Sequence, residues 1–319
     1  MSKVVLTKTL SEENKQILEA MPDVICVNVQ EGDAAAFAEQ IKDADALLLS
    51  TAFKMTAEVI ESAKNLKVIS RTGVGVDNVD VGAATAKGIL VLNTPDANSI
   101  SVAEHAVAMI AGISKQLLYY DAQLRKGNFK VRRLNLCVDI EGKTLGLIGC
   151  GKIGRLVAQK CESAFGMQVI GYDPFIQSDI DGIRIYKDIE DVFKNADYIS
   201  LHLPLTEDTR NMVGEKLLSL MKPSAYIINT ARGGVIDEQV LAKKLKEKAI
   251  AGAALDVLSA EPPLPDNPLL ELENIILTPH TAALTNECTE RVAREAIHGI
   301  ADFLSGRSPK YIFNKNVIR

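Results

Sequence analysis

The stretch KTLGLIGCGKIGRLVAQ, residues 143–159, decides the fold of this chain. An apolar run leads into it and a helical pattern, Lys152–Ala164, leads out. Between them, Gly149, Gly151 and Gly154 have the spacing G-x-G-x-x-G. A second apolar run follows and ends in Asp173, about 20 residues after the glycines. Strand, glycine turn, helix, strand and acid in this order predict a dinucleotide-binding βαβ unit.

Each glycine of this turn has its own physical reason. Gly149 allows the tight turn out of the strand, and Gly154 lets the helix pack closely on the strand. Gly151 has no Cβ, so a pyrophosphate can approach the backbone. The helix begins with Lys152 and Ile153, and its free N–H groups and partial positive charge would hold the phosphates. The alternative, a glycine turn that binds nothing, is disfavoured by the strands and helix around it.

Asp173 decides between the two nicotinamide dinucleotides. Its carboxylate would accept hydrogen bonds from the hydroxyls of the adenosine ribose. The same negative charge would repel a 2′-phosphate, so the sequence favours NAD over NADP as the cofactor.

Short apolar runs alternate with helical patterns along almost the whole chain, which predicts the α/β class. Runs this short and continuous fit strands buried on both faces of a parallel sheet. The expected strands are Val4–Leu6, Val24–Val29, Ala46–Leu49, Lys67–Ser70, Leu90–Leu92, Leu145–Gly149, Gln168–Tyr172, Arg184–Tyr186, Tyr198–Leu203, Ala225–Asn229, Gly252–Asp256 and Ile275–Leu277. A single long amphipathic helix, residues 99–126, is expected between the two series.

Composition excludes several classes of partner. The chain has 319 residues, 47% of them hydrophobic, and a net charge of −5 with mixed signs, so neither nucleic acid nor a membrane surface is favoured. The N-terminus has no signal-peptide pattern, and residues 100–118 are too polar to span a bilayer. The five cysteines lack metal-ligand spacing, so we expect no metal site. We expect them to be free thiols of a cytoplasmic protein, each filling a small-residue position of the core.

Further motifs identify a family. RTGVGVDNVD (71–80) and NTPDANSISVAEH (93–105) precede the glycine turn, and INTARGGVIDE (228–238), GAALDVLSAEPP (252–263) and LTPHTAAL (277–284) follow it. Together they resemble the D-isomer-specific 2-hydroxyacid dehydrogenases over essentially the whole chain. The wording of GVDNVD, KGILVLNTP and NTARGGVIDE is most similar to the 3-phosphoglycerate dehydrogenase branch, in a short form without a regulatory domain.

The resemblance implies an arrangement that the pattern alone does not give. Two doubly wound parallel-sheet domains are expected, a flavodoxin-like substrate domain and a Rossmann NAD domain, with the active site in the cleft that joins them. Residues 1–98 and 285–319 would form the substrate domain, and residues 99–284 the NAD domain. The long helix after Asn98 would contribute to a homodimer interface.

The resemblance also assigns a catalytic set. Arg232 follows the apolar strand AYIINTA, and its planar guanidinium would hold the substrate carboxylate at two points and polarise the carbonyl. His280 follows the last strand, and imidazole can give and take a proton near neutral pH. Glu261 would orient His280 and stabilise its protonated form. From position alone, His280 is as readily a polar loop residue. For Arg232 the alternative is a surface ion pair, which is disfavoured.

The remaining residues of the implied site fall into two groups. Besides the glycine turn, the cofactor would contact Asp173, His202, Pro204, Thr209, Thr230, Ala231, Arg232, Asp256, His280, Ala282 and Ala283, with Asp256 on the nicotinamide carboxamide. The substrate would contact Thr72, Gly73, Val74, Gly75, Asn98, Arg232 and His280, the glycine turn offering backbone N–H groups to a carboxylate. His105 is expected on the long helix, and His298, on the last helix, is expected to be structural.

Three departures from the branch affect the substrate. Ser50 stands where the branch commonly has an arginine for the substrate phosphate, which leaves Lys54, Arg71, Arg132 and Arg133 as alternative phosphate partners. HTAAL replaces the glycine pair often found after the histidine. The chain stops at Arg319, so no serine-binding regulatory domain and no inhibition by serine are expected.

Three functions therefore stay open. The first is NAD-dependent oxidation of 3-phosphoglycerate, in serine biosynthesis. The second, within the same class, is reduction of hydroxypyruvate or glyoxylate, because Ser50 removes the expected phosphate ligand. The third is an NAD(H)-sensing binding protein of the corepressor type, which uses the same fold without turnover.

Overall fold

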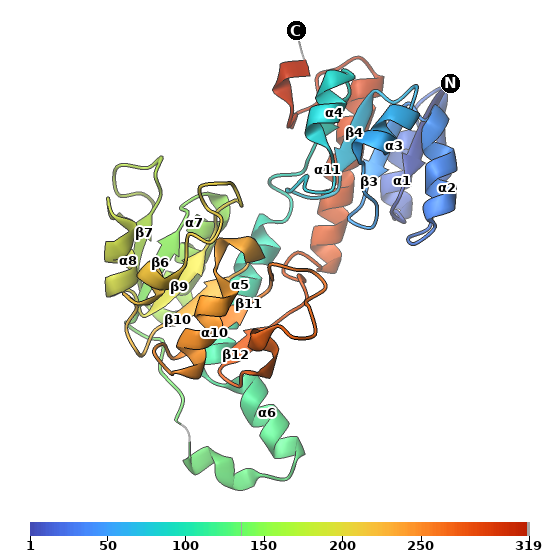
Figure 1. Cartoon of the computed structure of the whole chain (residues 1–319). Helices are drawn as coiled ribbons and strands as arrows, with labels where there is room; N and C mark the ends of the chain where they lie inside the picture. The colour runs from blue at the N-terminus through green and yellow to red at the C-terminus, as the bar shows by residue number, and fades with distance from the viewer. Residues whose placement is uncertain (135, 318–319) are drawn as a thin grey trace. The chain divides into compact units, whose positions relative to one another are not determined.

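The computed structural model describes residues 1–134 and 136–317. The chain divides into two compact units. Unit 1 comprises Met1–Asn98 and Leu284–Arg319, and unit 2 comprises Ser99–Ala283 (Figure 1). Unit 1 is therefore built from both ends of the chain, and unit 2 from its continuous middle.

Unit 1 contains one parallel sheet with the strand order β2-β1-β3-β4-β5 over its described residues. This is the flavodoxin-like order. The strand order reverses at β1, with β2 on one side of it and β3, β4 and β5 on the other. The strands are β1 (Ser2–Leu6), β2 (Val24–Asn28), β3 (Ala46–Leu49), β4 (Val68–Arg71) and β5 (Leu90–Leu92). The helices are α1 (Glu12–Glu19), α2 (Ala34–Gln40), α3 (Ala57–Ser62), α4 (Val81–Ala86) and α11 (Asn286–Leu304), with short 3-10 turns η1 (Ile41–Asp43) and η5 (Lys315–Val317).

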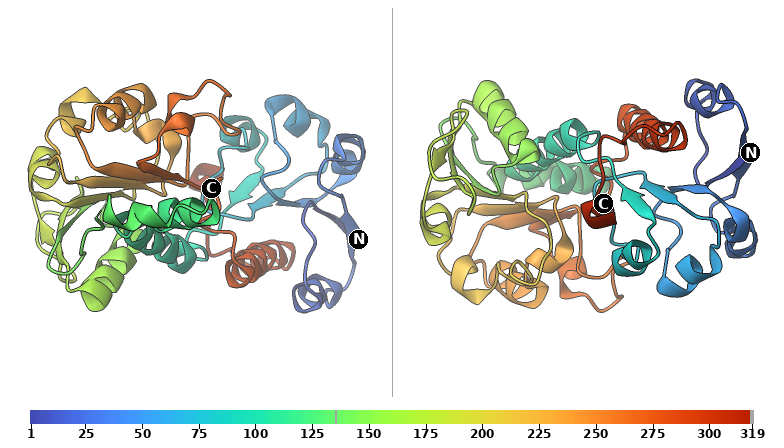
Figure 2. Two further views of the ribbon diagram at one scale, coloured as in Figure 1. Left: turned by 90° about the horizontal axis from the view of Figure 1, so that it is seen from below. Right: turned by 90° about the horizontal axis from the view of Figure 1, so that it is seen from above.

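Helices cover both faces of this sheet. Phe37 of α2, Ile60 of α3 and Ala84 of α4 pack on one face. Leu18 of α1 and Ile297 of α11 pack on the other. Both faces of β3, β4 and β5 are thus buried, which is why they read as continuous apolar runs. β2 is an edge strand and has no buried residue. The two helical layers can be followed in both views of Figure 2.

Unit 2 contains a second parallel sheet, with the order β12-β11-β10-β9-β6-β7-β8 among its described strands. The three strands β6, β7 and β8 lie on one side of the point where the order reverses, as in a Rossmann fold. The strands are β6 (Thr144–Ile148), β7 (Gln168–Tyr172), β8 (Arg184–Ile185), β9 (Tyr198–Leu201), β10 (Tyr226–Asn229), β11 (Gly252–Leu255) and β12 (Ile275–Leu277). Each expected strand therefore forms, and the expected α/β class is confirmed.

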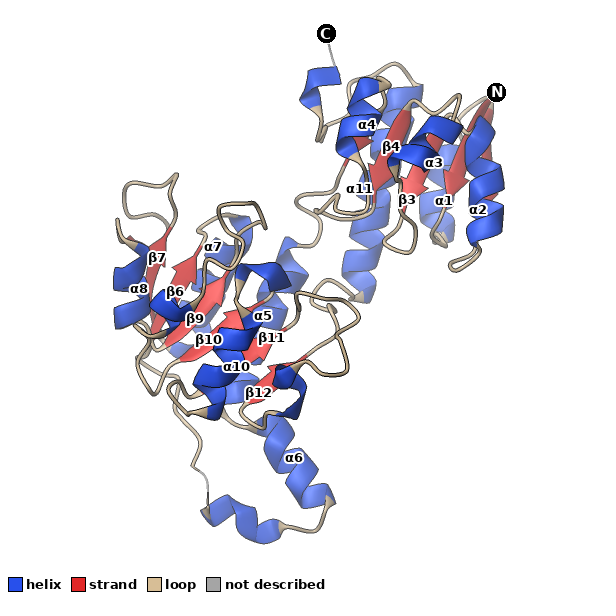
Figure 3. Cartoon of the chain, in the orientation of Figure 1, coloured by secondary structure: helices blue, strands red, loops and turns tan. Residues whose placement is uncertain are grey.

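The helices of unit 2 also form two layers, shown in blue around the red sheet in Figure 3. One layer packs α5 (Ser99–Ser114) and α7 (Lys152–Phe165) on the sheet through residues such as Ile110 and Val157. The other packs α8 (Ile189–Asn195), α9 (Glu215–Leu218) and α10 (Glu238–Lys246) through residues such as Phe193 and Leu241. Two short 3-10 turns, η3 (Gly233–Val235) and η4 (Pro268–Glu271), lie in the loops after β10 and β11.

Side chains at the helix starts fix several of these boundaries. The carboxylate of Asp80 accepts from the N–H of Ala83 at α4, and that of Asp237 accepts from two N–H groups at α10. Thr285 accepts from the N–H of Cys288 at α11. Such caps satisfy N–H groups that have no partner within the helix.

The expected single helix over residues 99–126 is wrong. α5 ends at Ser114, and α6 (Leu117–Arg125) begins after Gln116, which has φ 49°. A left-handed residue cannot continue an α-helix, so the chain turns there. α5 is mostly buried along its length, because it packs between the sheet and α7.

Two smaller expectations also need correction. Ile275, Ile276 and Leu277 are half-buried rather than buried, because β12 is the edge strand of its sheet. Cys137 is exposed, whereas Cys150, Cys161 and Cys288 are buried as expected; all five cysteines are free thiols.

One segment of unit 2, which we call the arm, extends away from the sheet. It comprises residues 117–134 and 136, with α6 and the 3-10 turn η2 (Phe129–Arg133), and runs out from the body of unit 2 in Figure 1. α6 has no buried residue. The exposed large apolar side chains of the arm are Leu117, Leu118, Leu124, Phe129, Leu134 and Leu136, each at least 58% exposed.

No helix of the described chain is long and apolar enough to cross a membrane.

Candidate active site

The glycine turn lies where the strand order of unit 2 reverses, between β6 and β9. Gly149 ends β6 with φ 93°, and a Cβ built on it would lie 2.3 Å from the carbonyl oxygen of His202, just after β9. A Cβ on Gly154 would lie 2.4 Å from the carbonyl oxygen of Gly149. Both glycines are therefore required by the protein's own packing.

Gly151 is different, because a Cβ there would meet no protein atom within 4 Å. It is exposed and stands at the N-cap of α7. The protein's own packing does not explain this glycine, but close approach of a phosphate to the backbone does. The space above Gly151 and the N–H groups of α7 thus fit the pyrophosphate of a dinucleotide.

Asp173 is fixed at the end of β7. One of its carboxylate oxygens accepts from the N–H of Cys150 at 2.9 Å, and the other accepts from the N–H of Phe175 at 2.9 Å. Each oxygen retains a lone pair for a ribose hydroxyl. Burial, together with the Asp173 charge, raises the pKa of the Cys150 thiol to about 12, so this thiol stays neutral beside the turn.

The two kinds of glycine give a prediction. Gly149→Ala should lower the free energy of unfolding by about 3 kcal/mol or more, because the new Cβ overlaps a backbone carbonyl at positive φ. Gly151→Ala should leave the unfolding temperature unchanged and weaken NADH binding by about tenfold or more. Thermal unfolding and NADH fluorescence titration measure both. Equal loss of stability in the two variants would contradict this division.

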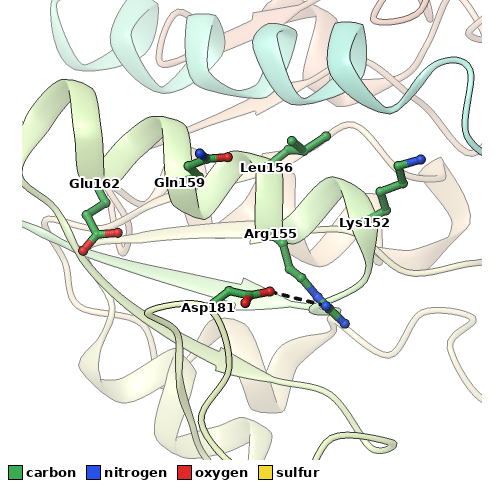
Figure 4. A pocket seen from close by; sticks show the side chains of 6 residues that line it. All are labelled: Lys152, Arg155, Leu156, Gln159, Glu162 and Asp181. Atoms are coloured by element: carbon green, nitrogen blue, oxygen red, sulfur yellow. Dashed lines mark hydrogen bonds and ion pairs between the residues drawn. The ribbon is translucent and has the colours of Figure 1, made fainter.

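A shallow pocket follows the first turns of α7 (Figure 4). Arg155 donates from Nε to the carbonyl of Cys150 at 2.9 Å, and its Nη1 lies 3.4 Å from Asp181. The pocket therefore borders the phosphate end of the helix. Its lining residues are Lys152, Arg155, Leu156, Gln159, Glu162 and Asp181.

The loop after β9 holds three of the expected cofactor residues. His202 bonds through Nε2 to Ser200 Oγ at 2.9 Å, and loss of solvent around its ring lowers the pKa of His202 to about 4. The imidazole is therefore neutral at physiological pH. Thr209 donates to the carbonyl of Pro204 at 2.7 Å, which closes the loop on itself.

Arg232 lies in the turn after β10. The side chain of Asn229 fixes this turn by accepting from the N–H of Ala231 and donating to the carbonyl of Arg232. The guanidinium donates to the carbonyl of Ala231 at 2.7 Å. Thr230 is 7% exposed, and its buried hydroxyl has no hydrogen-bond partner among the described residues.

The Arg232 turn packs directly on the loop that carries Glu261. A Cβ built on Gly233 would lie 1.9 Å from the carbonyl carbon of Leu258, so only glycine permits this contact. Glu261 accepts from the N–H of Leu258 through Oε1 at 3.2 Å. The chain neighbours of Arg232 and of Glu261 are thus in contact.

His280 and Glu261 are hydrogen-bonded, with Nδ1 of the imidazole 2.7 Å from Oε2 of the carboxylate. Their side chains are 48% and 41% exposed, so both can reach a ligand. His280 has φ 54°, a conformation rare for side-chain-bearing residues, and its N–H donates to the carbonyl of Asp256 at 2.7 Å. The loop, rather than local preference, imposes this conformation.

Asp256 fastens that loop. Its buried carboxylate accepts from Thr278 Oγ1 at 2.5 Å, from the N–H of Thr281 at 2.8 Å and from the N–H of Ala282 at 2.9 Å. Ala282 is buried, and Ala283 next to it is half-buried. The structure gives Asp256 the role of positioning the His280 loop; a contact with the nicotinamide carboxamide stays a prediction.

Two residues of this support were missed in the sequence. His105 of α5 lies 3.1 Å from Thr278 Oγ1 and 3.5 Å from Asp256 Oδ1, so the helix braces the loop. Glu238 accepts from the N–H of Ser259 and from Asn267 Nδ2. These two hydrogen bonds hold the loop that carries Glu261. Glu238 is a buried residue at the start of α10, which is unusual for a carboxylate. This position is the one signal that could have identified it.

The expected substrate residues lie in unit 1. Thr72 follows β4, and its N–H donates to the carbonyl of Leu49 at 2.9 Å. Gly73 has φ 154° and begins the turn that continues through Val74 and Gly75. Asn98 ends the first of the two segments of unit 1, and its buried Oδ1 has no hydrogen-bond partner among the described residues. The described residues contain no group of side chains that could hold a metal ion.

Comparison with known proteins gives the site a family. Residues 107–282 match the NAD binding domain of the D-isomer specific 2-hydroxyacid dehydrogenases. The chain is 43% identical over 318 residues to a D-3-phosphoglycerate dehydrogenase of Methanocaldococcus jannaschii, covering 98% of this chain and 60% of that protein. It is 39% identical over 287 residues to a glyoxylate reductase of Korarchaeum cryptofilum, covering 88% of this chain and 86% of that protein.

The fold is also similar to that of solved structures. A D-lactate dehydrogenase of Aquifex aeolicus, solved with NAD and lactic acid, matches with a TM-score of 0.82 and 31% identity, over 95% of this chain and 96% of that one. The expected resemblance, including that to 3-phosphoglycerate dehydrogenases, is thereby confirmed. The glycine turn, Asp173 and the matched domain agree on NAD as the cofactor. The chain belongs to the D-isomer-specific 2-hydroxyacid dehydrogenase family.

Proposed function

We propose that this protein is an NAD-dependent dehydrogenase that interconverts a small D-2-hydroxy acid and the corresponding 2-keto acid. The observation that carries the proposal is the Glu261–His280 contact of 2.7 Å, with Glu261 on a loop that packs against the Arg232 turn. An acid–base pair and a guanidinium are the groups that a keto acid needs in order to accept a hydride.

The chain's own residues divide the binding work. The N–H groups of α7 and the open backbone at Gly151 hold the pyrophosphate, and Asp173 holds the adenosine ribose. The loop after β9 and the buried hydroxyl of Thr230 line the rest of the cofactor. When bound, NAD supplies the hydride acceptor of the reaction, and NADH the donor.

Two groups handle the substrate. The Arg232 guanidinium holds the carboxylate and draws electron density from the carbonyl or hydroxyl oxygen. His280 has Nδ1 on Glu261, which leaves Nε2 as the ring atom that passes the proton to or from that oxygen. Glu261 stabilises the protonated ring during the step. Contacts of the substrate with the turn Thr72–Gly75 stay a prediction.

The preferred substrate in this proposal is 3-phosphoglycerate. The D-3-phosphoglycerate dehydrogenase of M. jannaschii, 43% identical, supports it. Its oxidation would place the enzyme at the start of serine biosynthesis, in the cytoplasm, which the free thiols favour. The second candidate is reduction of hydroxypyruvate or glyoxylate, which Ser50 and the glyoxylate reductase relative favour.

The test follows NADH absorbance with 3-phosphohydroxypyruvate, hydroxypyruvate and glyoxylate, each over a range of concentrations. A kcat/KM highest for the phosphorylated acid supports the first candidate, and a value highest for a plain acid supports the second. Tight NADH binding without turnover on any 2-keto acid would refute the enzyme and favour the corepressor-type binding protein.

We also propose that the protein is a homodimer whose contact includes the arm. The exposed apolar side chains of the arm form a surface of the kind that marks a contact with another protein molecule. The arm carries five Lys or Arg residues and one Asp, while the whole chain has a net charge of −5. A second copy therefore offers the arm a surface of opposite average charge.

This predicts a change of oligomeric state. Leu118→Glu combined with Leu124→Glu should weaken self-association by about 100-fold or more, because two apolar contacts are replaced by charges. Light scattering after size-exclusion chromatography measures the mass. Phe175→Glu, at a 92% exposed aromatic outside the arm, is the matched control and should leave the mass unchanged. A dimer that survives the double variant would show that the contact lies elsewhere.

A further inference from the structure

The loop that carries Glu261 has few ties to the rest of unit 2. Residues 258–266 follow β11 without forming a helix or strand, and residues 261–266 are all exposed. Among the described residues, hydrogen bonds from this loop to the rest of the unit reach two side chains. Glu261 bonds to His280, and the N–H of Ser259 donates to the Glu238 carboxylate. Because the exposed part of the loop has little packing, the placement of Glu261 depends on these two side chains.

Glu238 is a buried carboxylate at the first position of α10, with 9% of its surface exposed. Its Oε1 accepts from the N–H of Ser259, and its Oε2 accepts from Asn267 Nδ2 at 2.9 Å. Among the described residues it forms no ion pair with a lysine, arginine or histidine. A buried charge is costly unless its hydrogen bonds are made, so these two bonds hold both ends of the loop firmly.

Glu238 and Arg232 lie on one continuous segment, which joins β10 to α10. The N–H of Val213 donates to the carbonyl of Val235 at 3.1 Å, and the N–H of Asp237 donates to the carbonyl of Val213 at 3.1 Å. These two bonds fix the middle of the segment to a neighbouring part of unit 2. The position of the Glu238 carboxylate relative to the Arg232 turn is therefore set by the backbone.

Consecutive N–H groups of the loop bind the two carboxylates. The N–H of Leu258 donates to Glu261 Oε1 at 3.2 Å, and the next N–H, that of Ser259, donates to Glu238. Gly233 contacts the same two residues, since a Cβ on it would lie 1.9 Å from the carbonyl carbon of Leu258 and 2.4 Å from the nitrogen of Ser259. Glu238 therefore places the Glu261 carboxylate relative to the segment that carries the guanidinium.

We propose that Glu238 is a positioning residue, which holds the Glu261–His280 pair at a fixed place relative to Arg232. This inference deepens the proposed function and rests on it. Reduction of a keto acid requires that Arg232 holds the carboxylate while His280 protonates the carbonyl oxygen, so these two groups must keep one separation. A displacement of about 1 Å can lower the rate by about 100-fold. Because Glu238 is buried, it acts through the loop and not on the substrate.

The experiment exchanges the carboxylate of Glu238 with the amide of Asn267. In Glu238→Gln, the remaining oxygen can still accept from Ser259, but the new NH₂ group faces the NH₂ group of Asn267, and two donors cannot bond. Asn267 cannot reverse its amide without loss, because its Oδ1 accepts from the N–H of Leu269 at 3.0 Å. The variant should lower kcat by about 10- to 100-fold and change the KM for NADH by less than about threefold.

Addition of Asn267→Asp to Glu238→Gln should restore the rate. The new carboxylate can accept from the new amide and from the N–H of Leu269, so every bond of the network is made again with the same total charge. The kcat of the double variant should lie within about threefold of wild type. Glu247→Gln, the same change at the exposed far end of α10, is the matched control and should leave kcat unchanged.

Steady-state assays use the acid that the wild type reduces best among the three named above. NADH fluorescence titration counts the binding sites, so kcat is expressed per folded site and is not lowered by loss of folded protein. Glu238→Asp separates position from charge, because it keeps the carboxylate but shortens the side chain by one carbon. It should lower kcat by about tenfold.

Two results would overturn the inference and leave the proposed dehydrogenase intact. One is a kcat per site of Glu238→Gln within about threefold of wild type, and the other is a double variant as slow as Glu238→Gln alone. If Glu238→Gln does not fold, Glu238→Asp takes its place, and a wild-type kcat in that variant overturns the inference. If the wild type reduces none of the three acids, the proposed function itself fails.

Discussion

Replacement of His280 is expected to lower kcat by about 10²- to 10⁴-fold, the range of general acid–base catalysis, with little change in NADH affinity. In the proposed mechanism the imidazole carries the proton, because Glu261 is bound to its Nδ1 and Nε2 is the atom left for the substrate. Steady-state assays with a saturating 2-keto acid measure kcat, and NADH fluorescence measures cofactor binding.

The choice of variant matters because His280 has φ 54°. Asparagine adopts this left-handed conformation readily, whereas alanine does so only at a cost in energy. His280→Asn should therefore keep the loop in place and still lose the proton transfer. Glu261→Gln, which keeps the size but removes the charge, should give a smaller loss than His280→Asn.

The outcome that would contradict the proton relay is clear. If His280→Asn retains kcat within about threefold of wild type, the ion pair is structural and another group must move the proton. If the kcat loss is accompanied by an equal loss of NADH affinity, the variant has disturbed the loop that Asp256 fastens, and the comparison must rely on Glu261→Gln.

Replacement of Arg232 should have the second large effect. Arg232→Ala is expected to lower kcat/KM for any 2-keto acid by about 10²- to 10⁴-fold, because two charge-assisted hydrogen bonds to the carboxylate are lost. Arg232→Lys should recover only part of this, since an ammonium cannot bind a carboxylate at two points in one plane. The measurement is kcat and KM in both directions of the reaction.

A matched arginine controls for charge and folding. Arg184 is exposed and stacks on Tyr186 with its guanidinium 5.3 Å from the ring centre, far along the chain from the turn after β10. Arg184→Lys should leave kcat/KM unchanged. An Arg232→Lys variant as active as Arg184→Lys would remove Arg232 from the catalytic set.

Much of the fold was predictable because the signals are local. Each strand reads as a short apolar run, since both faces of a parallel sheet are buried under helices. The glycine turn was predictable for the same reason, because Gly149, Gly151 and Gly154 act within one strand–turn–helix unit. The break at Gln116 was not predictable, because no proline or glycine marks it. The left-handed conformation of Gln116 depends on the direction in which the arm leaves the sheet.

By itself the sequence determined the α/β class, the order of the strands along the chain, the dinucleotide turn and the family, because these depend on neighbours in sequence. The tertiary structure decided which distant residues meet. It placed His105 against Asp256 and packed Gly233 on Leu258. The physical reason is the strand order, which brings the carboxyl ends of non-consecutive strands to one edge and is not written in any local pattern.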